Sequence, residues 1–156
     1  MAVRSSRMVR SAAPAGHAQD AARGAIANRY LKYMPKDTAR LVLVVEDDVS
    51  VRRPLVKFLE MHGFSVVTAE TSDEGLEQLR QNNLVAAVVD LRLRRGSGRD
   101  VVVATPAEVP VIIFSGVPSE SAELERLRPR TRLIEKPYSL VLLVETLEEM
   151  MAEANR

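Results

Sequence analysis

The chain has 156 residues, 46% of them hydrophobic, which is enough for one compact domain with a core and an appendage but too few for two full domains. It contains no cysteine, so disulfides, zinc sites built on cysteine and a thiol nucleophile are excluded. No apolar run approaches the ~20 residues that span a bilayer, and the N-terminus lacks the apolar stretch of a secretory signal, so we expect a cytoplasmic protein without a membrane segment.

Charge is distributed unevenly along the chain. Residues 1–40 hold eight basic and two acidic side chains, which leaves 14 of the 22 basic and 19 of the 21 acidic residues for the remainder. The first part is therefore +6 and the rest −5. We predict a basic N-terminal arm at 1–38 and a folded domain at 39–156. A short amphipathic helix is expected in the arm, because apolar residues recur every four positions at Ala22, Ile26, Tyr30 and Met34.

The first half of the domain alternates between strand and helix patterns. The apolar run 41–45 ends in acids, as is typical of a parallel strand buried on both faces. Asp48 is expected to cap a helix that ends near Gly63, where glycine suits the left-handed cap. A second strand is predicted at 64–69, and Thr71 has the spacing of a capping box that begins the next helix.

The same alternation continues toward the middle of the chain. A third strand at 84–89 terminates in Asp90. The glycine-containing loop that follows leaves room only for an abbreviated helix at 101–104. The apolar run 111–114 predicts the fourth strand, which ends at Ser115.

The last elements complete the pattern. Ser119 or Ser121 is predicted to cap a fourth helix, a short strand follows at 133–134, and Ser139 is predicted to cap the final helix. Five strands alternating with five helices predict an α/β fold with a doubly wound parallel sheet covered on both faces.

Polar residues follow the apolar runs at the ends of the predicted strands. They are Glu46, Asp47, Asp90, Ser115 and Lys136. Ligands of such sheets bind beyond the carboxyl ends of the strands, so these side chains are expected to form one site. Three adjacent carboxylates force a proton onto one of them or require a divalent cation, and oxygen ligands suit Mg²⁺. With a lysine and a hydroxyl opposite, the set is equipped for phosphoryl transfer.

The segments VVEDD, VVDLRL, VIIFSG and IEKPY resemble the motifs of the receiver domain of bacterial two-component response regulators, and the resemblance covers residues 40 to about 151. It implies a flavodoxin-like sheet with the strand order 2-1-3-4-5. It also implies that a histidine kinase or a histidine phosphotransfer protein phosphorylates the chain, which then signals to a downstream protein through protein contacts.

The resemblance further implies a role for each matching residue. Asp90 would be the phosphoacceptor, Ser115 would hydrogen-bond the phosphoryl group and Lys136 would form an ion pair with it, with a cis peptide bond before Pro137. The Mg²⁺ ligands would be Glu46, Asp47, Asp90 and the backbone carbonyl of Arg92.

Three positions differ from the family pattern in ways that bear on mechanism. Leu133 stands where many receivers have a switching aromatic residue. Arg92 adds positive charge two residues after Asp90, and Val117 removes a polar group that could orient water. We therefore predict that the phosphoryl group hydrolyses slowly.

The sequence also bears on four alternatives to this function. A receiver-fold binding module that acts without phosphorylation stays open because of Leu133. A phosphohydrolase with an aspartate nucleophile is not expected, since such enzymes need a second acid where this chain has Arg92. Arginines clustered at 92–99 and 126–132 invite a nucleic-acid interpretation, but almost no aromatic residues accompany them, so solvated faces are expected instead. A homodimer stays open.

Overall fold

The computed structural model describes residues 40–116 and 118–156, so the predicted arm, its helix and Val117 lie outside this part of the chain. The strands are β1 (Leu41–Val45), β2 (Ser65–Ala69), β3 (Ala86–Asp90), β4 (Val111–Ser115) and β5 (Thr131–Glu135). The helices are α2 (Val49–Met61), α3 (Ser72–Gln81), α4 (Gly98–Ala104), α5 (Pro118–Leu127) and α6 (Leu140–Ala154). Within these residues, no helix is both long enough and apolar enough to cross a membrane.

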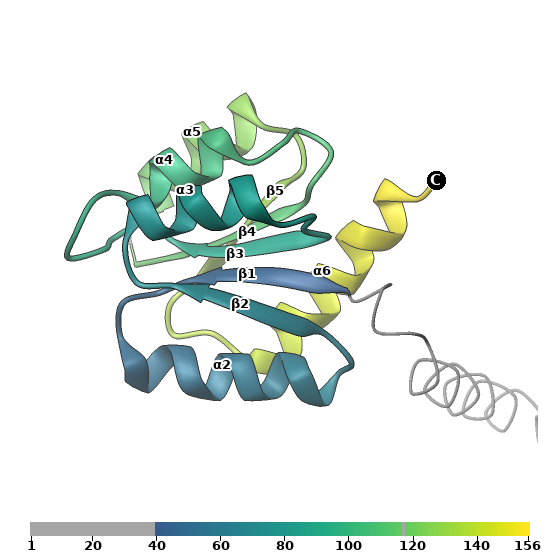
Figure 1. Cartoon of the computed structure of the whole chain (residues 1–156). Coiled ribbons are helices and arrows are strands. Elements are labelled where there is room, and N and C mark those ends of the chain that lie inside the picture. Colours follow the sequence, from purple (N-terminus) through teal and green to yellow (C-terminus); the bar gives the residue numbers. More distant parts are fainter. Residues whose placement is uncertain (1–39, 117) are drawn as a thin grey trace, which may run out of the picture. The chain divides into compact units, whose positions relative to one another are not determined.

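The strands form one parallel sheet in the order β2-β1-β3-β4-β5, which confirms the predicted fold class and strand order. Helices α3, α4 and α5 cover one face, and α2 and α6 cover the other (Figure 1). Successive side chains of a strand point to opposite faces. Val42 and Val44 of β1 therefore pack in the core beneath α2 and α6, while Leu43 and Val45 pack in the core beneath the other three helices.

Both layers of the core are built from fully buried aliphatic side chains. On one face, Leu55 and Leu59 of α2 meet Leu143 and Leu147 of α6. The central strands are buried on both sides, which explains why their sequences are continuous apolar runs rather than alternating ones. A rigid sheet of this kind fixes the positions of the residues that follow each strand.

Most predicted helix starts are confirmed. Asp48, Thr71 and Ser139 each accept a backbone N–H of the helix that follows. The predicted cap of the fourth helix is wrong, because α5 begins at Pro118 and both Ser119 and Ser121 lie inside it. Proline suits the first helical position, where no intrahelical hydrogen bond is lost.

Arg128 is also a correction, because it is buried rather than solvated. Its guanidinium donates to the carbonyls of Pro106 and Val109 in the α4–β4 loop and, at 3.0 Å, to the carbonyl of Arg130. A buried charge is tolerated when its donors are satisfied in this way. Arg128 thus joins two loops at the amino end of the sheet, and its burial lowers the pKa of the guanidinium.

The connection between β3 and α4 is compact, and α4 is short, although with seven residues it begins three residues earlier than predicted. Ser97 caps the helix by accepting the N–H of Arg99 at 3.2 Å, and the N–H of Gly98 donates to the carbonyl of Leu91 at 3.1 Å. Gly98 packs so closely on the end of β3 that an added Cβ would lie 1.9 Å from the carbonyl oxygen of Asp90. The helix can approach Asp90 only because this residue has no side chain.

We expect Gly98→Ala to destabilise the protein by about 2 kcal/mol, because the backbone of either β3 or α4 must move to admit the methyl group. Gly116→Ala is the matched control, since a Cβ there meets no atom within 4 Å, and its expected change is below about 0.5 kcal/mol. Urea unfolding followed by circular dichroism measures both. Equal stability of the two variants would contradict the packing argument.

Candidate functional site

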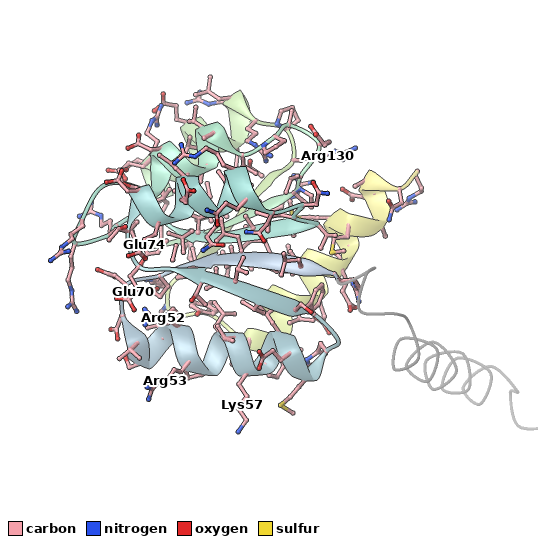
Figure 2. The ribbon with its side chains drawn as sticks, in the orientation of Figure 1. Arg52, Arg53, Lys57, Glu70, Glu74 and Arg130 are labelled. Atoms are coloured by element: carbon pink, nitrogen blue, oxygen red, sulfur yellow. The ribbon has the colours of Figure 1, made fainter. Side chains whose placement is uncertain are left out.

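The carboxyl ends of the strands bring the predicted residues to one edge of the sheet. Register pairs Val45 with Val89, so Glu46 and Asp90 emerge from adjacent strands. Ser115 pairs with Glu135 across β4 and β5, and its carbonyl accepts the N–H of Lys136 at 3.2 Å. Figure 2 shows Arg52, Glu70 and Glu74 at the end where β2 stops, with Arg130 at the far end.

Three carboxylates converge at this edge. Glu46, Asp47 and Asp90 each place one carboxylate oxygen within 4.8 Å of the others. Glu46 is 1% exposed and Asp90 is 4% exposed, so solvent screens their charges poorly. Such a cluster is unfavourable unless its negative charge is reduced. In each of the three acids a different group or a proton does so.

Lys136 compensates Asp90. Its Nζ donates to Asp90 Oδ2 at 2.7 Å and lies 3.7 Å from Glu46 Oε2. The ammonium group also sits over the ring of Phe114, 4.9 Å from its centroid. The peptide bond between Lys136 and Pro137 is cis, as expected. Lys136 follows β5, which is separated from β3 by β4, and its side chain reaches across the end of β4 to the acids.

The negative charge of Glu46 is reduced by partial protonation of its carboxyl group. Its Oε1 accepts the N–H of Asp48 at 2.9 Å, whereas its buried Oε2 has no hydrogen-bond partner among the described residues. The pKa of Glu46 is raised to about 7, chiefly by burial and in addition by the negative charge of Asp90, against the lowering effects of the Asp48 N–H and Lys136. Glu46 is therefore only partly ionised near neutral pH.

Asp47 is held by the loop that follows β3. The backbone N–H of Arg94 donates to Asp47 Oδ2 at 2.8 Å, and the Nε of the same arginine lies 3.5 Å from that oxygen. This contact is not predicted from the sequence, which favours a solvated face for the arginines near Asp90. A spacing of 47 residues separates the partners, so only the tertiary structure reveals it.

The remaining predicted residues also lie at this edge. Ser115 is buried at the end of β4. The backbone N–H of Arg92 donates to Asp90 Oδ1 at 3.0 Å, while its guanidinium lies 3.9 Å from Glu120 of α5. Leu133 donates its backbone N–H to Glu125 of α5 at 2.7 Å. The residues after β3 and the middle of β5 thus each make a polar contact with α5.

An apolar hollow of about 560 Å³ adjoins the site and was not predicted. It is lined by Ser50, Val51, Pro54, Lys136, Pro137, Tyr138 and Leu140. Burial raises the pKa of Tyr138 to about 12, and the negative charges of Glu46 and Asp90 add to that effect. Val141 and Leu142, in the first turn of α6, are exposed apolar residues, and that exposure is visible only in the structure.

Comparison with known proteins agrees with this geometry. The model of the response regulator receiver domain matches residues 42–148, which is more than half of the chain. The chain belongs to the response regulator receiver domain family. Its function is phosphoacceptor signalling of the two-component type. No comparison favours the alternative of a binding module that acts without phosphorylation.

Curated relatives of this receiver domain are bacterial regulators. The regulatory protein VirG of Rhizobium rhizogenes is 39% identical over 84 residues, which cover 53% of this chain and 35% of VirG. The acid tolerance regulatory protein ActR of Rhizobium meliloti is 41% identical over 63 residues, covering 40% of this chain and 32% of ActR. The matched part of the chain thus spans about a third of the length of these relatives.

A solved structure shares the fold. The receiver domain protein of Methanospirillum hungatei, described as CheY-like, superposes with a TM-score of 0.70 at 24% identity, covering 76% of this chain and 98% of that one. The likeness supports the observed strand order.

Because the pKa of Glu46 is raised, we expect the free energy of unfolding to depend on pH. Because the pKa of Glu46 in the fold is about 7 rather than 4.5, the folded protein binds a proton more tightly than the unfolded chain does. This group's contribution to stability is therefore lost as the pH rises through about 7. In metal-free buffer we expect Glu46→Gln to be more stable than wild type by about 1–3 kcal/mol near pH 8, and by less near pH 5.

Urea unfolding with a chelator present measures the difference at both pH values. Asp73→Asn serves as the control, since Asp73 lies exposed in the first turn of α3. A stability difference for Glu46→Gln that does not change with pH would show that Glu46 is ionised throughout.

Proposed function

We propose that Asp90 is the residue that accepts the phosphoryl group, from a phosphohistidine of a histidine kinase or a histidine phosphotransfer protein. The observation that carries this assignment is the buried Asp90 carboxylate held by Lys136 Nζ at 2.7 Å, beside two further acids. In the transfer, an Asp90 carboxylate oxygen forms a bond to phosphorus as the bond from phosphorus to the donor histidine nitrogen breaks. The histidine leaves neutral once that nitrogen regains a proton.

The three carboxylates fit a magnesium ion. One oxygen from each lies within 4.8 Å of the others, and Glu46 Oε2 is a buried acceptor without a hydrogen bond among the described residues. Mg²⁺ prefers such oxygens and retains positions for phosphate oxygens. Glu46, Asp47, Asp90 and, by the family resemblance, the backbone carbonyl of Arg92 would hold it. Bound there, the ion would neutralise charge that develops on the transferring phosphoryl oxygens.

Two further side chains would bind the oxygens of the phosphoryl group. The Lys136 ammonium, now paired with Asp90, would form an ion pair with the incoming phosphoryl oxygens. Ser115, on the neighbouring strand end, would donate its hydroxyl to the same group. A doubly charged group at this edge would bias the domain between two conformations and so alter the surface that a downstream protein contacts.

The phosphodonor is proposed to dock over the apolar hollow beside Lys136. The hollow is lined by Lys136, which contacts Asp90, and by Leu140 at the start of α6, where Val141 and Leu142 expose further apolar area. An amphipathic helix that carries the donor histidine matches this shape. Signalling to a downstream protein, a homodimer and a cytoplasmic location remain predictions. The same holds for the expectation that the chemistry is limited to self-phosphorylation and dephosphorylation.

Incubation with a small-molecule phosphodonor and Mg²⁺ is expected to label wild type with one phosphoryl group and to leave Asp90→Asn unlabelled. Intact-protein mass spectrometry measures the increment, and a chelator should abolish it. Asp100→Asn is the control, because Asp100 is an exposed acid in the first turn of α4, close to the site in sequence. Labelling of Asp90→Asn at the wild-type level would refute the assignment.

The phosphoryl group is expected to be long-lived, since Arg92 places positive charge two residues after Asp90. Its guanidinium is 64% exposed and paired only loosely with Glu120, so it is free to shield the phosphoryl group from water. Arg92→Asn should shorten the half-life by up to about tenfold, which corresponds to a change of about 1.4 kcal/mol in the barrier to hydrolysis. The half-life is measured by following the loss of the phosphoryl label after the phosphodonor is removed. Rapid loss of the label that is unchanged in Arg92→Asn would contradict the prediction.

A further inference from the structure

Arg94 makes two contacts with the same oxygen of a proposed metal ligand. Its backbone N–H lies 2.8 Å from Asp47 Oδ2, and its Nε lies 3.5 Å from that oxygen. The Asp47 side chain is only 14% exposed, whereas the arginine is 81% exposed. The guanidinium therefore approaches the carboxylate from the solvent side of the site.

The loop that carries Arg94 is held in a defined conformation. Arg92 and Ser97 pair as an antiparallel bridge across it, and the N–H of Ser72 in α3 donates to the carbonyl of Arg95 at 3.4 Å. Gly96 takes a left-handed φ of 79° beside Ser72, where a Cβ would collide with the serine hydroxyl. Arg94 thus reaches Asp47 from a fixed turn of the chain.

We propose that Arg94 is a positioning residue that holds Asp47 in the metal-free protein and sets the affinity of the site for divalent cations. The inference rests on the proposed magnesium site. A cation that coordinates Asp47 must share the carboxylate with the guanidinium or displace it, and the two positive groups repel each other. The backbone N–H, in contrast, keeps the carboxylate oriented whatever the side chain does.

The neighbouring arginines do not share this geometry. Arg95 follows directly in the same loop, yet its side chain forms no hydrogen bond or ion pair with the described residues. Arg92 faces Glu120 instead. The proposed effect is therefore specific to one side chain, although all three carry the same charge.

Isothermal titration of the full chain with MgCl₂ at low ionic strength tests the proposal. Removing the guanidinium in Arg94→Gln should tighten Mg²⁺ binding about three- to tenfold, the range that loss of one exposed ion pair and its repulsion allows. Arg95→Gln removes the same charge without the contact and should change the affinity less than about twofold. Arg94→Lys, which keeps the charge, should stay close to wild type.

The outcomes separate this inference from the proposed function. If wild type binds Mg²⁺ and Arg94→Gln binds it equally or more weakly, the role of Arg94 is refuted while the metal site stands. If Arg94→Gln and Arg95→Gln raise the affinity for Mg²⁺ equally, the effect comes from net charge, and the specific role of Arg94 is refuted. Absence of Mg²⁺ binding in every variant would overturn the metal site together with the inference. The difference between the two glutamine variants should shrink at high salt, because the contact is exposed.

Discussion

The carboxylates of Glu46, Asp47 and Asp90 lie within 4.8 Å of one another at the edge of a buried sheet, and their mutual repulsion is the constraint around which the site is organised. Burying an uncompensated charge costs several kcal/mol, so each acid needs its own counterpart. Asp90 has the ammonium of Lys136, Asp47 has Arg94, and the raised pKa of Glu46 leaves that carboxyl partly protonated near neutral pH. Under the proposed function, Mg²⁺ and the phosphoryl group would take over these roles.

The fold supplies the rigidity that such a site requires. β1, β3 and β4 are packed on both faces, so their carboxyl ends cannot shift without disturbing the core. The loops that leave these ends carry the chemistry and are themselves fixed, by the close approach of Gly98 to Asp90 and by the cap at Ser97. Side chains on well-packed strand ends can therefore be held to the precision that phosphoryl transfer demands.

Contacts between the site and α5 suggest how a change at Asp90 would reach the surface. Leu133 replaces the aromatic residue found in many receivers, and its backbone N–H is bound by Glu125. Arg92 and Arg99 form ion pairs with Glu120 and Glu123 on the same helix. Exposed ion pairs contribute little to stability, and for that reason they can be rearranged at small cost when a charged group is added nearby. The polar contacts of α5 are consistent with a switch that does not depend on a rotating ring.

Much of this protein could be predicted from sequence because the signals are local. Buried parallel strands read as apolar runs, helix caps lie within three residues of the groups they bind, and parallel topology brings every strand end to one edge. The acids, the serine and the lysine could therefore be placed together without coordinates. The resemblance of four segments to the motifs of receiver domains then indicates that the chemistry is phosphoryl transfer.

Only the tertiary structure decided what depends on contacts distant in sequence. The pairing of Arg94 with Asp47 spans 47 residues, and the burial of Arg128 depends on a loop 19 to 22 residues away. An arginine in a polar stretch looks the same whether it is solvated, paired or buried, since the distinction lies in its neighbours. The raised pKa of Glu46 is likewise absent from its sequence, because it arises from burial and from an acid on another strand.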